Sequence, residues 1–265
     1  MFWWEPAALT VDERTLELPW RGRGSLRIAV LTDLHVGSPF NGIAKLRDAV
    51  ARTNAADPDI ICILGDLVIQ GVAGGSFVPP EAIAAELKPL KAHGGVFAVL
   101  GNHDAWLDHR RVRDALQQNG IRVLEEDAAS IATRAGPIWI AGVSDFWTGR
   151  HDIRAALAAV HDDGAPVILL THNPDIFVDV PARVTLTLAG HTHGGQVRLP
   201  FIGPPIVPSR FGQRFAAGHV VEGGRHLFVA TGVGTSILPV RFRVPPAIAL
   251  LTLQEARGLG NAPPR

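Results

Sequence analysis

The chain has 265 residues, of which 47% are hydrophobic and 19% charged, and this composition excludes an intrinsically disordered protein. Its 25 basic and 25 acidic residues balance, so we expect no nucleic-acid partner held by bulk electrostatics. No apolar run is long enough to span a bilayer, and no signal peptide is visible.

Apolar runs predict the strands of this chain, and helical spacing predicts its helices. In the first half we expect an edge strand at 16–20, a turn at 21–24, strands at 26–31, 60–64 and 96–100, and helices at 43–54, 80–93 and 108–119. In the second half we expect strands at 121–123, 129–133 and 138–141 in antiparallel ribbons, a helix at 153–161, strands at 167–170 and 184–188, a long ordered loop at 199–218, and closing strands at 227–230 and 248–253. We expect one domain over 1–265, with 1–24 as an edge segment and 255–265 as a frayed tail.

Five of these strands end in side chains that can bind a metal ion. Carboxylates, imidazoles and one amide oxygen suit a divalent ion of borderline hardness. They are too many for one tetrahedral ion and sufficient for two ions that share a carboxylate. In chain order they are Asp33, His35, Asp66, Asn102, His103, His172, His191 and His193.

Each of these residues also has an ordinary structural interpretation. Asp33 could cap a helix, Asp66 and Asn102 could form turns, and His172 could lie at a helix start. Five separate coincidences would then be needed to explain the pattern. The joint pattern therefore favours a metal site.

His103 differs from the other histidines because it directly follows Asn102 in Gly101-Asn102-His103-Asp104. We expect the side chains of Asn102 and His103 to point to different sides of a loop. His103 could then protonate a leaving oxygen, with Asp104 orienting its ring. The alternative is a loop histidine bonded to Asp104 that has no catalytic role.

Taken in order, these motifs resemble the signature of the calcineurin-like metallophosphoesterases. The motifs are Asp33-Leu34-His35, Gly65-Asp66, Gly101-Asn102-His103-Asp104, His172 and Gly190-His191-Thr192-His193. The segments 190–196, 232–234 and 239–241 look most similar to a bacterial branch of the superfamily. That branch contains membrane-associated phosphodiesterases and UDP-2,3-diacylglucosamine pyrophosphatases.

The resemblance implies an α+β fold, an αββα sandwich of two mixed sheets flanked by helices, with a dinuclear metal site at the strand ends. It implies that Asp66 bridges two divalent ions, with manganese expected first and iron or zinc as alternatives. His103 would be the catalytic acid or a substrate-orienting residue. The remaining ligands would divide into Asp33, His35 and His193 for the first ion, and Asn102, His172 and His191 for the second.

The expected activity is hydrolysis of a phosphodiester or pyrophosphate bond through attack by a metal-bound hydroxide. The branch resemblance points to a lipid-linked substrate such as UDP-2,3-diacylglucosamine, and to a cytoplasmic protein with peripheral contact at the inner membrane face. A general phosphodiesterase acting on nucleotides or nucleic acid is the enzymatic alternative. A scaffold of the same fold that binds a partner without catalysis is the alternative of another class.

Substrate contacts are predicted from aromatic and basic residues near the motifs. Phe40 and the pair Phe146-Trp147 could place apolar surface beside the site, or could pack on their own domain. Arg241 and Arg243 could pair with a phosphate, or could lie on a solvated edge strand. The aromatic opening at 2–4 could cover the domain edge or meet a membrane interface.

Overall fold

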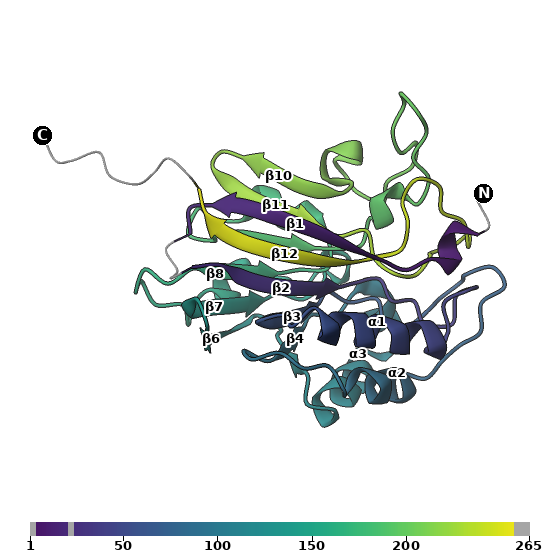
Figure 1. Ribbon diagram of the computed structural model, residues 1–265, viewed down its shortest axis with the longest axis horizontal. Helices are drawn as coiled ribbons and strands as arrows, with labels where there is room; N and C mark the ends of the chain where they lie inside the picture. Colours follow the sequence, from purple (N-terminus) through teal and green to yellow (C-terminus); the bar gives the residue numbers. More distant parts are fainter. Residues whose placement is uncertain (1–3, 21–23, 257–265) are drawn as a thin grey trace, which may run out of the picture.

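The computed structural model describes residues 4–20 and 24–256. Two six-stranded sheets pack against each other, and helices lie on their outer faces (Figure 1). The strand orders are β1-β12-β2-β3-β4-β5 and β10-β11-β9-β8-β7-β6, and both sheets mix parallel with antiparallel pairs. The expected αββα sandwich is therefore confirmed.

The elements of the first sheet are β1 (Thr10–Leu18), β2 (Leu26–Leu31), β3 (Ile60–Ile63), β4 (Val96–Ala98), β5 (Arg122–Val123) and β12 (Ala247–Glu255). Those of the second are β6 (Asp127–Thr133), β7 (Gly136–Gly142), β8 (Val167–Leu170), β9 (Leu186–Ala189), β10 (Gly218–Glu222) and β11 (Arg225–Val229). The α-helices are α1 (Ile43–Ala55), α2 (Pro80–Leu87), α3 (Asn102–Gln118) and α4 (Ile153–Ala156). Short 3-10 turns are η1 (Glu5–Ala7), η2 (Phe146–Thr148), η3 (Pro174–Asp179), η4 (His193–Gly195) and η5 (Gly212–Phe215).

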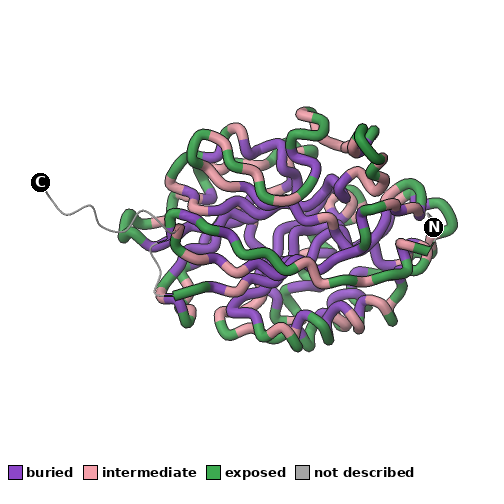
Figure 2. Tube along the Cα trace, turned by 45° about the horizontal axis from the view of Figure 1, so that its top comes forward, coloured by how far each residue is buried: buried purple, intermediate pink, exposed green. Residues whose placement is uncertain are grey.

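Strand β3 shows why the apolar runs predict this architecture. All four of its residues are buried. Ile60 and Cys62 face the second sheet, whereas Ile61 and Ile63 face the layer of helices α1, α2 and α3. A strand covered on both faces needs a continuous apolar run, and the buried core in Figure 2 lies between exposed outer elements.

The parallel strands bring the polar motifs to one end of the molecule. In the first sheet β2, β3 and β4 run parallel, and in the second sheet β7, β8 and β9 do. Residues that follow β2, β3, β4, β8 and β9 therefore gather at one edge of the sandwich, where open α/β sheets place their ligands.

Three predicted elements were wrong in extent. Helix α3 begins at Asn102, six residues before the predicted start at 108, so Asn102 and His103 lie in its first turn and not in a loop. The backbone of Asp108 is not helical and kinks α3, so the predicted helix corresponds to the part of α3 after the kink. Helix α2 ends at Leu87 and not at 93, because Pro89 has no backbone N–H to continue the helical hydrogen bonds. Helix α4 covers four residues, not the predicted 153–161.

The strand pairing also differs from the prediction in two places. Only β6 and β7 form the expected antiparallel ribbon, since β5 pairs parallel with β4 in the other sheet. Strand β10 was not predicted, although Gly223-Gly224 joins it to β11 as a hairpin. The residues of β10 are half-buried or exposed, so this strand lacks the long apolar run from which the other strands were predicted.

The edge strand predicted at 16–20 is confirmed as part of β1, which pairs only with β12 at the sheet edge. The residues at 21–23 of the predicted turn, and 257–265 of the predicted tail, lie outside the described residues. Trp4, the described end of the aromatic opening, is exposed and contacts Phe40. Within 4–20 and 24–256, no helix combines the length and apolarity needed to cross a bilayer.

Replacing Gly65 by Ala should destabilise the fold and separate two of the strand-end loops. Gly65 has a φ of +87°, and a Cβ atom there would lie 2.2 Å from the backbone nitrogen of Gly101. Gly71 is the matched control, because its φ is +65° and no atom lies within 4 Å of an added Cβ. We expect Gly65→Ala to lower the free energy of unfolding by about 2 kcal/mol more than Gly71→Ala does, measured by urea denaturation. Equal losses would show that the close approach is not rigid.

Candidate metal centre

The strand-end residues form three overlapping groups of ligand atoms that lie within 4.8 Å of one another. The first group is Asp33, His35 and His193, with 3.3 Å between Asp33 Oδ1 and His193 Nε2. The second is Asp66, His172 and His191, with 3.2 Å between Asp66 Oδ2 and His172 Nε2. The third group, which contains His35, Asp66 and His103, joins them.

Asp66 belongs to the second and third groups and lies beside the first. Its Oδ2 is 3.6 Å from His35 Nε2 on one side and 3.2 Å from His172 Nε2 on the other. The Asp66 side chain is 2% exposed. One buried carboxylate therefore faces the imidazoles of both halves.

Backbone carbonyls fix the orientation of two imidazoles. His35 Nδ1 lies 3.1 Å from Val68 O, and His172 Nδ1 lies 2.7 Å from Leu64 O. A carbonyl can only accept, so Nδ1 of each ring carries a proton. Each Nε2 points into the cluster, which is the ring orientation typical of metal-bound histidine.

Unpaired buried atoms show that the cluster fits cations. Among the described residues, Asp33 Oδ1, Asn102 Oδ1 and His191 Nε2 are buried and have no hydrogen-bond partner. A buried polar atom left unpaired costs about 1–3 kcal/mol. All three are donor atoms for divalent metal ions, so bound ions would remove this cost.

Burial favours the neutral form of two of the rings. It lowers the pKa of His35 to about 4 and that of His191 to about 3. These two rings are therefore neutral at pH 7, which is the form that binds a metal ion. In His172 burial would also lower the pKa, but the neighbouring Asp66 carboxylate raises that pKa well above its usual value.

His103 lies at the mouth of the cluster. Its side chain is 13% exposed, and its Nε2 is 4.0 Å from Asp66 Oδ2. Its ring meets that of His35 edge-on, with 4.9 Å between the ring centres. His103 is thus the histidine of the third group that solvent can reach.

Asp104 does not orient His103, so that prediction was wrong. His103 Nδ1 has no partner among the described residues. The Asp104 carboxylate instead accepts hydrogen bonds from the backbone nitrogens of Asp66, Leu67 and Gly101, at 2.7, 2.9 and 3.0 Å. Because Asp104 is in the first turn of α3, its side chain turns back to the loop after β3 and fixes the position of Asp66.

The two predicted phosphate-binding arginines lie away from the mouth of the cluster. Arg241 is fully buried, and its guanidinium donates to the backbone carbonyls of Thr231, Gly234 and Val244 at 2.7–3.1 Å. Its predicted contact with substrate is therefore wrong. Arg243 is exposed and lines a separate cavity that contains none of the metal-ligand residues.

Two exposed tryptophans flank the histidines of the cluster. The Trp147 ring meets His191 edge-on, with 4.3 Å between the ring centres, and stacks on Trp106 at 6.1 Å. The Trp106 ring centre lies 5.3 Å from that of His103, with 54° between the ring planes. Together with Asp145 these tryptophans line a cavity of about 390 Å³.

Trp106 was missed by the sequence analysis because the start of α3 was placed too late. With the helix beginning at Asn102, Trp106 lies three residues after His103 and falls on the same helix face. Phe40, also predicted near the substrate, is 47% exposed and contacts Trp4.

Known proteins resemble this chain over most of its length. The family model described as calcineurin-like phosphoesterase matches residues 26–195. The uncharacterized metallophosphoesterase YkuE of Bacillus subtilis is 31% identical over 95% of this chain and 87% of its own length. The phosphodiesterase YaeI of Escherichia coli is 33% identical over 86% of this chain and 82% of its own.

The fold is also similar to that of a solved structure. The NAD nucleotidase of Haemophilus influenzae superposes with a TM-score of 0.54 at 14% identity. The match covers 79% of this chain and 45% of that one, so this chain spans less than half of the solved protein. At this identity the similarity concerns the fold alone.

Replacing Asp104 by Asn should destabilise the protein because Asp104 holds the loop of Asp66. An amide retains one acceptor oxygen and turns an NH2 group toward backbone N–H groups that need an acceptor. We expect a loss of about 1–3 kcal/mol in the free energy of unfolding and a lower content of bound metal. The exposed Asp108→Asn on the same helix is the control. Unchanged stability and metal content, with slower hydrolysis alone, would restore a direct role beside His103.

Proposed function

This chain belongs to the calcineurin-like phosphoesterase family and is a phosphoester hydrolase, and we propose that it cleaves phosphodiesters with two divalent metal ions. The position of Asp66 between two groups of ligand atoms carries this proposal. Manganese is the ion we propose first, with iron or zinc as alternatives. The proposed ligands are Asp33, His35 and His193 for one ion, and Asn102, His172 and His191 for the other, with Asp66 shared.

Ions held there would lower the pKa of a water molecule and neutralise charge on the phosphate. His103 is proposed as the acid that gives its Nε2 proton to the leaving oxygen. Its position supports this role, because its side chain reaches solvent while its Nε2 is 4.0 Å from Asp66 Oδ2. Asp104 is proposed as a positioning residue that acts through the backbone of Asp66.

A diester is the substrate class that the surroundings of the cluster favour. The 390 Å³ cavity is lined by Trp106 and Trp147, whose rings contact His103 and His191, and it gives a second substituent on phosphorus a place to lie. Trp106 and Trp147 are 53% and 44% exposed, so their rings offer an apolar, stacking surface for that substituent. The similar protein YaeI of Escherichia coli is named a phosphodiesterase, which agrees with this choice.

A lipid-linked diester or pyrophosphate such as UDP-2,3-diacylglucosamine is the finer proposal. Its support is the exposed aromatic pair of Trp4 and Phe40, which are 74% and 47% exposed in loops at the motif end of the sandwich. Such a substrate would bring the protein to the inner membrane face as a cytoplasmic, peripheral enzyme. Nucleotides without acyl chains are the competing substrates.

Hydrolysis of an aryl phosphodiester with added manganese tests the proposed activity. We expect His103→Ala to reduce the rate roughly 100- to 10,000-fold, as loss of a general acid does, and Asp66→Ala to abolish it. His219→Ala, on the exposed strand β10, is the control and should keep the wild-type rate. An active Asp66→Ala variant would contradict the two-ion proposal. A wild-type protein that binds metal and hydrolyses no phosphoester would favour the scaffold alternative.

Comparing acylated with unacylated substrates tests the finer proposal. We expect a higher kcat/KM for UDP-2,3-diacylglucosamine than for UDP-N-acetylglucosamine, and expect Phe40→Ser to reduce that preference. Phe77→Ser, another exposed phenylalanine, serves as the matched control. Equal kcat/KM values for both substrates would remove the lipid-linked proposal and leave the general phosphodiesterase.

A further inference from the structure

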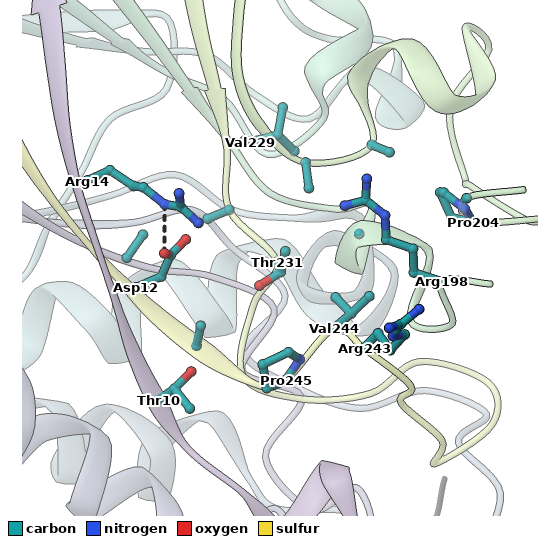
Figure 3. A pocket seen from close by; sticks show the side chains of 18 of the residues that line it. Thr10, Asp12, Arg14, Arg198, Pro204, Val229, Thr231, Arg243, Val244 and Pro245 are labelled. Atoms are coloured by element: carbon teal, nitrogen blue, oxygen red, sulfur yellow. Dashed lines mark hydrogen bonds and ion pairs between the residues drawn. The ribbon is translucent and has the colours of Figure 1, made fainter. Parts of the chain in front are cut away.

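A second cavity, of about 450 Å³, lies between the edges of the two sheets (Figure 3). Thr10 and Ala247 line it from β1 and β12 of the first sheet, and Gly218 and Val229 from β10 and β11 of the second. None of the proposed metal ligands lines it. This cavity is therefore distinct from the catalytic cluster.

The charged side chains of the lining are three arginines and one aspartate. Arg14 Nε donates to Asp12 Oδ1 at 2.7 Å, so the aspartate is already paired. Within 4–20 and 24–256, the guanidinium groups of Arg198 and Arg243 have no acceptor, and Figure 3 shows both across the cavity from Arg14. The Glu5 carboxylate, which is not part of the lining, accepts from the backbone nitrogens of Arg243 and Val244 at 3.0 and 2.7 Å. The lining itself holds three arginines against one aspartate, and so carries an excess of positive charge.

Small residues leave room for a ligand beside these cations. Much of the remaining lining is glycine and alanine, including Gly203, Ala217 and Ala230. The volume lies within the range of about 300–1,000 Å³ that is usual for small-molecule sites. A planar guanidinium group can donate two parallel hydrogen bonds to two oxygen atoms of one phosphate group.

We propose that this cavity is a second, non-catalytic site that binds a phosphate group through Arg198 and Arg243. The phosphate can belong to a soluble molecule or to a phospholipid head group. The second source is considered because Phe201, which is fully exposed, lines an adjoining hollow together with the same two arginines.

The site has a structural connection to the metal cluster. Gly194 lines the cavity and directly follows His193 in η4. A Cβ atom at Gly194 would lie 2.8 Å from Val244 Cγ1 and 3.1 Å from Thr231 Cγ2, so η4 packs closely on two other lining residues. A ligand in this cavity would therefore lie beside the turn that contains His193.

Calorimetric titration of inorganic phosphate into the manganese-loaded, full-length protein tests the site. Phosphate is also expected to occupy the metal centre, so the comparison is between wild type and the double variant Arg198→Ala/Arg243→Ala. We expect the double variant to lose one binding site per chain, or to bind there at least tenfold more weakly. Arg154→Ala, an exposed arginine on α4, should leave both sites intact.

Cosedimentation with vesicles distinguishes the two sources of phosphate. Binding to phosphatidylglycerol vesicles but not to phosphatidylcholine vesicles, lost in the double variant, would assign the site to a lipid head group. Arginine-dependent binding of inorganic phosphate without vesicle binding would assign it to a soluble molecule. If the double variant matches wild type in both measurements, the proposal is overturned. This outcome would leave the metal-dependent hydrolysis untouched, since neither arginine is among the proposed catalytic residues.

Discussion

The buried carboxylate of Asp66 is the feature on which the arrangement of the site depends. A carboxylate taken out of water is tolerated only where partners surround it. Its Oδ2 faces imidazoles of both halves, and its Oδ1 accepts from the backbone nitrogen of His103 at 2.9 Å. These partners come from both sheets and from α3, so the pairing of one side chain requires the whole sandwich to be assembled.

Backbone strain is concentrated at the same residues. Five proposed ligands have φ between +38° and +68°, a left-handed region that non-glycine residues rarely adopt. Such a conformation costs about 1–3 kcal/mol at each residue and persists only where the surroundings enforce it. A site that served packing alone would not need this strain, which agrees with a functional constraint. The five are Asp33, His35, Asp66, His191 and His193.

The sequence predicted the parts of the fold that depend on burial and strand direction. The limits of β2 and β8 agree with the prediction to the residue, because β8 is a continuous apolar run, β2 is apolar except for Arg27, and both are followed by polar motifs. The clustering of the motifs followed from parallel strands. The start of α3 was missed because Gly101-Asn102 is equally typical of a turn, although Asp104 caps the helix locally by accepting from Gly101 N. Only the bonds that Asp104 accepts from Asp66 and Leu67 depend on the fold. Arg241 was misassigned for a similar reason, because a local pattern does not show which distant carbonyls surround a guanidinium.

Two buried charged residues that are not proposed ligands hold the two sides of the cluster. Asp104 fixes the loop of Asp66 through backbone N–H groups, and Arg241 fixes the turn at 231–234 through backbone carbonyls. That turn packs on the first group so closely that a Cβ atom at Gly232 would lie 2.6 Å from Asp33 Cβ. The Asp104 carboxylate therefore accepts from backbone N–H groups on one side of the cluster, and the Arg241 guanidinium donates to backbone carbonyls on the other side. The positions of the ligand atoms are thus set by the backbone before any ion binds, and the unpaired atoms that remain are those that an ion would satisfy.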